Sequence, residues 1–182
     1  GADIQLQSKL NDHQITYGID YSIVNTERLR TTKTIGGSTV KEKDTPDTEI
    51  KRTGVYLQDE ISYGKFDFIA GIRYDNYDLD AKTDSVFTTE EWAYDLNESS
   101  ISPKIAATYR LTDQLSAYSQ YSKGFRAPAY YEVNGDYDNP RHGYTVKSNP
   151  DLDPETSDSY EIGFRGRYKQ FDFNIAGFLN KY

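Results

Sequence analysis

The sequence predicts an all-β chain, an antiparallel up-and-down meander of about eight strands. Apolar and polar residues alternate with a period of two in one segment after another. Short turns alternate with long polar connections, and tyrosine supplies 17 of the 182 residues. Aromatic residues mark both edges of barrels that cross outer membranes, so these features favour the wall of a transmembrane β-barrel.

The second segment shows the alternation clearly. Ile15, Tyr17 and Ile19 share one face, whereas Thr16 and Asp20 take the other. Successive side chains of a strand point to opposite faces, so each such segment has one apolar face and one polar face. The expected strands are 2–10, 14–25, 51–62, 66–78, 99–111, 115–123, 157–168 and 171–182.

Later segments repeat this pattern. In chain order, the apolar faces of four of them consist of Phe66, Phe68, Ala70, Ile72 and Tyr74, then Ile101, Ile105, Ala107 and Tyr109, then Tyr160, Ile162 and Phe164, and finally Phe171, Phe173 and Ile175. The segment 115–123 is less regular, because Tyr118 and Tyr121 fall on opposite faces. No segment shows a sustained helical period, and the glycine and β-branched content also disfavours helix.

The connections alternate in length without exception. Short turns are expected at Asn11-Asp12, Tyr63-Gly64-Lys65, Thr112-Asp113 and Lys169-Gln170. Long polar segments are expected at 26–50, 79–98 and 124–156. Outer-membrane barrels have short turns on the periplasmic side and long loops outside. A soluble sandwich produces the same strand alternation, so periodicity alone leaves that alternative open.

Composition narrows the function classes. The net charge of −8 leaves no basic face for nucleic acid, and the absence of cysteine excludes disulfide scaffolds and thiolate metal sites. With two histidines and no Gly-x-Ser-x-Gly or phosphate-binding glycine-rich motif, the sequence predicts no enzyme. The chain also contains no methionine, so we expect a piece of a longer protein.

Two short motifs carry a resemblance to a known family. The first box is Gly124-Phe125-Arg126-Ala127-Pro128, and the second is Asn149-Pro150-Asp151-Leu152-Asp153-Pro154-Glu155-Thr156-Ser157, followed by Tyr160-Glu161-Ile162-Gly163. Both boxes resemble those of TonB-dependent outer-membrane receptors, as do 55–60, 71–75 and 101–104 upstream. The Phe-Arg-Ala-Pro form resembles the haem and haemoglobin receptor branch, whereas the second box recurs in siderophore receptors as well.

The boxes also have a plain structural interpretation. Pro128 has no N–H and cannot continue a central strand, so the first box is expected to end one. Pro150 and Pro154 fix φ shortly before the next strand begins. These residues have two possible roles: they shape the base of a loop, or they contact a ligand.

The resemblance implies a larger assembly. Receptors of this family are 22-stranded barrels with a plugged lumen. Residues 1–182 are then expected to be a fragment of the barrel domain, without the plug that would contact the TonB complex. The implied location is the outer membrane of a Gram-negative bacterium, with the apolar face of the sheet against lipid.

The resemblance also implies a haem site between the boxes. An iron-ligating histidine is expected in that interval, and His142 is the candidate there, because neutral imidazole is a suitable axial ligand. Tyr144 is a second possible ligand or stacking partner, and Arg141 suits the haem propionates. Haem is then a transported ligand, delivered free or by a haem-carrying protein, and no intrinsic cofactor is expected. The alternative is that these residues belong to an ordinary solvated loop without a ligand. The other histidine, His13, is expected to be a solvated turn residue.

Three functions therefore remain open. The first is haem uptake, and the second is siderophore uptake by the same fold. The third is a closed eight-stranded barrel with a structural or adhesion role, which requires strand 2–10 to pair with strand 171–182.

Overall fold

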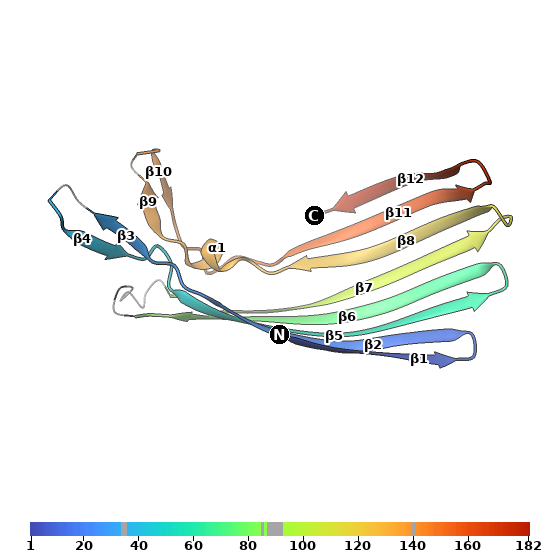
Figure 1. Cartoon of the computed structure of the whole chain (residues 1–182), viewed down its shortest axis with the longest axis horizontal. Helices are drawn as coiled ribbons and strands as arrows, with labels where there is room; N and C mark the ends of the chain where they lie inside the picture. Colours follow the sequence, from blue (N-terminus) through green and yellow to red (C-terminus); the bar gives the residue numbers. More distant parts are fainter. Residues whose placement is uncertain (34–35, 85, 87–92, 140) are drawn as a thin grey trace.

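The computed structural model describes residues 1–33, 36–84, 86, 93–139 and 141–182. Its main feature is one antiparallel sheet of eight strands in the order β1-β2-β5-β6-β7-β8-β11-β12 (Figure 1). The strands are β1 (Ala2–Leu10), β2 (His13–Thr26), β5 (Asp47–Tyr63), β6 (Phe66–Lys82), β7 (Leu96–Arg110), β8 (Leu115–Arg126), β11 (Glu155–Arg167) and β12 (Asp172–Lys181). All eight predicted strands are confirmed.

The remaining described elements lie in two of the three long connections, the one between β2 and β5 and the one between β8 and β11. They are β3 (Arg30–Lys33), β4 (Thr39–Glu42), α1 (Tyr130–Asn134), β9 (Tyr137–Asn139) and β10 (Tyr144–Val146). All of them gather at one end of the sheet, while the short turns gather at the other (Figure 1). The sequence did not predict these elements, because strands of three or four residues and a five-residue helix are too short to show a period.

Several strands are longer than predicted at the loop end. β5 begins at Asp47 and β6 continues to Lys82, and these two residues pair with each other. The polar residues that suggested loops are thus part of a ladder that extends past the apolar part of the sheet. The short turns are as predicted, and Asn11 and Gly64 adopt left-handed backbone conformations there, with φ of 53° and 59°.

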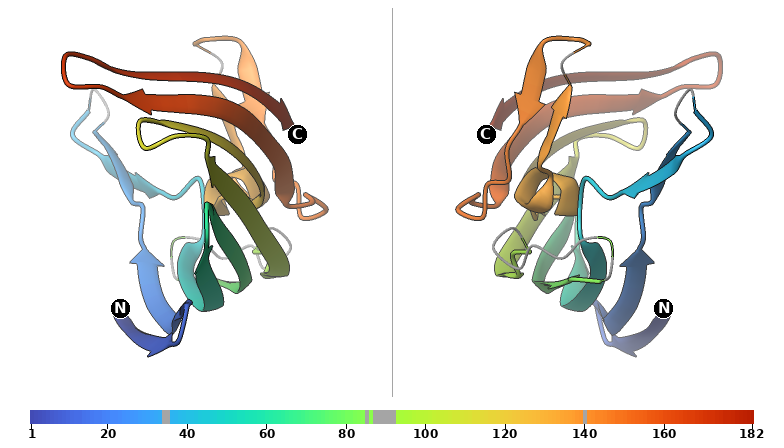
Figure 2. Two further views of the ribbon diagram at one scale, coloured as in Figure 1. Left: turned by 90° about the vertical axis from the view of Figure 1, so that its right-hand side faces the viewer. Right: turned by 90° about the vertical axis from the view of Figure 1, so that its left-hand side faces the viewer.

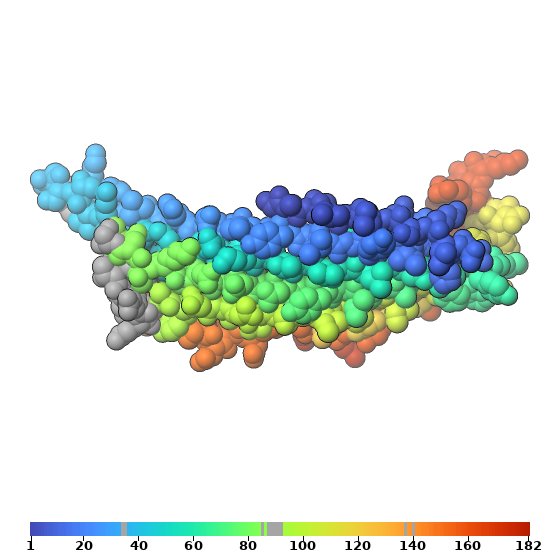
Figure 3. Space-filling view, turned by 90° about the horizontal axis from the view of Figure 1, so that it is seen from below, coloured from blue at the N-terminus to red at the C-terminus, as the bar shows by residue number. Residues whose placement is uncertain are grey.

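The sheet is open. Among the strands that the structure describes, β1 pairs with β2 and β12 pairs with β11, and β1 and β12 do not pair with each other. The alternative of a closed eight-stranded barrel is therefore wrong. The strands follow a curved surface (Figure 2), and β1, β2, β5, β6 and β7 lie side by side in a continuous wall (Figure 3).

The two faces of the sheet differ in chemistry. One face, here called the outer face, exposes large apolar side chains such as Ile4, Leu6, Ile19, Leu57, Ile72, Ile105, Ile162 and Ile175. On β6 this apolar row runs from Phe66 to Tyr74. Its length matches the roughly 9–11 residues with which a tilted strand crosses a bilayer. None of the helices in the described ranges is long and apolar enough to cross a membrane.

The opposite face, here called the inner face, is polar over most of its length. At the loop end it carries the one buried apolar cluster of the described residues, formed by Ile50, Tyr77, Leu79, Leu96 and Val133. Val133 belongs to α1, so this helix packs against the concave side of β5, β6 and β7 (Figure 2). The connection between β8 and β11 thus folds inward.

Pairing between β7 and β8 stops partway along the strands. The ladder runs from Arg110–Ser116 to Lys104–Ser122, although both strands continue towards the loop end. The next residue of β7 is Pro103, which has no N–H to offer to a ladder. β7 and β8 then diverge (Figure 1), and this leaves room on the inner face for the segment that follows β8.

Candidate functional site

The two boxes meet at the loop end of the sheet. β8 and β11 are neighbours, and their ladder pairs Phe125 with Thr156 and Arg126 with Glu155. β8 ends at Arg126, before Pro128, and β11 begins directly after Pro154. The predictions that the first box ends a strand and that the second leads into one are therefore confirmed.

The arginine of the first box is held by two carboxylates. Arg126 Nη2 donates to Glu132 Oε1 at 2.9 Å, and Arg126 Nη1 lies 3.0 Å from Glu155 Oε1. The other oxygen of Glu132 accepts the backbone N–H of Ala129 at 2.7 Å. These two hydrogen bonds, first from Ala129 and then from Arg126, hold the pKa of Glu132 below its ordinary value. Arg126 thus fastens the first box to α1 and to the second box, as the structural interpretation predicts.

The asparagine at the end of α1 joins two loops. The side chain of Asn134 is fully buried. Its amide nitrogen donates to the carbonyl oxygen of Tyr94 at 2.9 Å, and its amide oxygen accepts the N–H of Tyr94 at 2.7 Å. Asn134 therefore reproduces a backbone pairing between the 124–156 connection and the segment that precedes β7. The sequence did not mark Asn134 as a site residue, because an asparagine in an aperiodic loop carries no signal of burial.

The connection between β2 and β5 is tied to the same assembly. Asp44 is buried, accepts a hydrogen bond from Arg30 at 2.9 Å, and receives the N–H of Asp136 at its backbone oxygen at 3.1 Å. Lys43 contacts the carboxylates of Asp47 and Asp84. Burial lowers the pKa of Lys43, but these two carboxylates outweigh burial and hold it above its ordinary value. The three long connections therefore form one structure.

A hollow on the inner face lies beside this assembly. Its volume is about 520 Å³, and β5, β6 and the first box provide its walls. The lining residues are Arg52, Arg73, Asp75, Asn76, Tyr77, Phe125, Arg126, Ala127, Pro128 and Ala129. The size suits a small-molecule site, for which roughly 300–1,000 Å³ is common.

The residues proposed for haem lie elsewhere, on a projecting hairpin. Arg141 and His142 form the turn between β9 and β10, and Tyr144 is the first residue of β10. All three side chains are exposed, and the N–H of His142 donates to the carbonyl oxygen of Asn139 at 3.1 Å. The hairpin stands away from the main sheet (Figure 1). The structure thus brings these three residues together, and none of them lines the hollow beside the first box.

The second histidine differs from the prediction. His13 is the first residue of β2, and its Nδ1 lies 2.7 Å from Oδ2 of Asp59. It is therefore paired across the sheet and is not a free turn residue. The described residues contain no group of three or more His, Cys, Asp or Glu side chains that could hold a metal ion.

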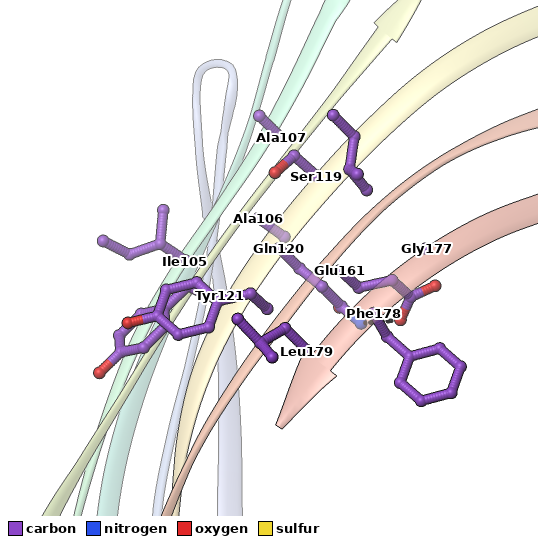
Figure 4. Close-up of a pocket in the computed structure, with 12 residues that line it drawn as sticks. Ile105, Ala106, Ala107, Ser119, Gln120, Tyr121, Glu161, Gly177, Phe178 and Leu179 are labelled. Atoms are coloured by element: carbon purple, nitrogen blue, oxygen red, sulfur yellow. Dashed lines mark hydrogen bonds between the residues drawn. The ribbon is translucent and has the colours of Figure 1, made fainter. Parts of the chain in front are cut away.

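A second hollow, of about 580 Å³, opens among β7, β8, β11 and β12. Figure 4 shows Ile105, Tyr121 and Leu179 on one side of these strands and Phe178 on the other. Small residues, Ala107 and Gly177, lie in register between the larger outer-face side chains. This hollow belongs to the apolar outer face, so we assign it to lipid contact and not to ligand binding.

An open, curved sheet with an apolar outer face, a polar inner face and loops at one end defines part of the wall of an outer-membrane barrel. The family model "TonB dependent receptor-like, beta-barrel" matches residues 1–182. The chain belongs to this family, and its location is the outer membrane of a Gram-negative bacterium. The family consists of receptors and transporters and not of enzymes.

Two curated relatives show the similarity in sequence. The chain is 31% identical over 169 residues to a "Hemin receptor" of Yersinia pestis, a match that covers 86% of this chain and 22% of the relative. It is 32% identical over 124 residues to "Hemoglobin-haptoglobin utilization protein B" of Neisseria meningitidis serogroup C, covering 65% of this chain and 15% of the relative. The chain therefore spans about a fifth or less of the length of these relatives.

Solved structures show the same fold. "Copper transporter OprC" superposes with a TM-score of 0.76 at 13% identity, covering 98% of this chain and 28% of that one. The hemophore receptor HasR of Serratia marcescens, solved with its hemophore HasA and heme, gives 0.73 at 20% identity, covering 98% and 32%. These matches agree with eight strands of a barrel that has 22 in total.

Proposed function

We propose that this chain belongs to an outer-membrane receptor that binds haem, from free haem or from haemoproteins, and imports it with energy supplied through TonB. The observation that carries the proposal is the 31% identity to a hemin receptor over 86% of the chain. The Phe125-Arg126-Ala127-Pro128 box and the similarity to a haemoglobin-haptoglobin utilization protein support the same ligand.

The β9–β10 hairpin is the proposed point of haem capture. His142 supplies an imidazole for the haem iron, and its exposure leaves the ring accessible. Tyr144 offers a phenol or an aromatic face beside it, and Arg141 offers a guanidinium for the propionates. The inward-folded base of the same connection, fixed by Asn134 and Arg126, gives the hairpin a rigid support.

The transport step needs parts of the receptor other than this sheet. Within the described residues, the edge strands β1 and β12 each have one unpaired edge, which the remaining barrel strands would cover. We propose that residues 1–182 are a fragment of the barrel domain and that a separate plug contacts the TonB complex. Outer-membrane lipid covers the outer face, and haem or a haem-carrying protein approaches from the loop end.

Growth of a strain that depends on this receptor for iron tests the proposal. We expect growth with haem as the sole iron source, loss of growth when the receptor gene is deleted, and recovery when it is restored. Ferric siderophores are the matched alternative, because other family members recognise them. Receptor-dependent growth on a siderophore and none on haem would replace the haem proposal with the siderophore function.

A further inference from the structure

Three guanidinium groups line the hollow between β5, β6 and the first box, and two of them are already neutralised. Arg73 lies 2.8 Å from Asp20 Oδ1 and 2.7 Å from Asp75 Oδ1. Arg126 bonds Glu132 and Glu155 in the same manner. Each of these arginines therefore has two carboxylates within salt-bridge distance, and neither has free charge to offer to a ligand.

Arg52 is different. It is exposed on the inner face of β5, and its guanidinium carbon lies 5.5 Å from the centre of the Tyr77 ring. Among the residues that the structure describes, no carboxylate lies within salt-bridge distance of Arg52, in contrast to Arg73 and Arg126. Tyr77 is almost completely buried, so it gives the guanidinium a fixed aromatic support without neutralising it.

The surroundings of Arg52 suit an anion of moderate size. Asp75, the acidic residue of the lining, accepts a hydrogen bond from Arg73 Nε at 2.8 Å. Pro128, the last residue of the first box, and the following Ala129 form the wall opposite β5 and β6. A guanidinium binds a carboxylate through two parallel hydrogen bonds, and such charge-assisted bonds are strong where walls of protein displace water.

We propose that Arg52 and the hollow beside the first box form a subsite for a carboxylate group of the ligand. The inference rests on the proposed haem function, in which the carboxylates are the two propionates of the porphyrin. Arg52 is then a specificity-determining residue that selects anionic ligands after capture on the hairpin. Arg73 and Arg126 keep the walls of the subsite in place and do not touch the ligand.

The test compares two ligands and three variants of the full-length receptor in detergent. The ligands are haem and its dimethyl ester, in which both propionates have lost their charge. Arg52→Gln removes the guanidinium. Arg52→Lys keeps the positive charge but cannot form the two parallel hydrogen bonds of a guanidinium. Arg165→Gln is the matched control, because Arg165 also lies over a tyrosine, Tyr118, at 5.3 Å, but outside this hollow.

We expect Arg52→Gln to weaken haem binding by about tenfold or more, the size of one lost charge-assisted contact. Arg52→Lys should give an intermediate loss, and Arg165→Gln should leave the affinity unchanged. The dimethyl ester should bind the native receptor and Arg52→Gln equally. Haem binding that is unaffected by Arg52→Gln, or an equal loss for both ligands, would overturn the subsite alone. Absence of haem binding to the native receptor would overturn the haem function and the subsite with it.

Discussion

Replacing Asn134 with leucine should release the 124–156 connection from the segment before β7. Leucine has a similar volume but cannot pair with Tyr94, so the N–H and carbonyl of Tyr94 both lose their partners. An unpaired buried polar group costs about 1–3 kcal/mol. Because Tyr94 is only half-buried, the lower part of that range applies, and the two groups together cost about 2–3 kcal/mol. The equilibrium constant between the docked and the released connection should therefore fall by a factor of roughly 30–150.

Hydrogen exchange of the folded receptor measures this change directly. We expect faster exchange of the Tyr94 amide and of the α1 amides in Asn134→Leu. The amides of the sheet near the short turns should exchange at an unchanged rate. Asn139→Leu is the control, because the Asn139 side chain donates to the hydroxyl of Tyr144 within the projecting hairpin, at 3.1 Å. Unchanged protection at Tyr94 in Asn134→Leu would refute the inference that this side chain joins the two loops.

Two further perturbations test other parts of the structure. The lowered pKa of Glu132 means that its contacts stabilise the folded loop above its ordinary pKa of 4.5, and that this contribution is lost as the pH falls through the lowered value. Proteolysis of the loop should therefore accelerate in that acidic range, and in Glu132→Gln it should already be fast at neutral pH. On the outer face, Ile72→Arg should shift the free energy of folding into lipid vesicles by about 2–4 kcal/mol in favour of the unfolded state. Gln58→Arg on the inner face should fold normally in the same vesicle assay.

The strands were predictable because the bilayer imposes a strict pattern. Every second residue of β6 from Phe66 to Tyr74 must be apolar, and that requirement is visible without any tertiary information. Beyond the bilayer the constraint ends, so the polar extensions of β5 and β6 resembled loops. The proline positions in the two boxes remained informative there, because proline limits its own backbone wherever it lies.

The candidate site was only partly predictable. The boxes identified the place where β8 and β11 meet, and Arg126 was named through them. Glu132, the partner of Arg126, and Asn134, which joins two loops, lie in a segment with no periodicity. Their roles depend on tertiary contacts that a sequence does not display. Arg52 has the pattern of an ordinary polar-face residue, and only the hollow around it distinguishes it from Arg165. The role of His142 in ligation stays a prediction.

A hemin titration of the full-length receptor, followed by Soret absorbance, tests the haem function most directly. We predict a saturable Soret shift for the native protein and a weaker shift, with reduced affinity, for His142→Ala. A saturable shift that His142→Ala leaves unchanged would keep the haem function but assign the iron ligand to another residue. Absence of saturable binding to the native receptor would contradict the haem function.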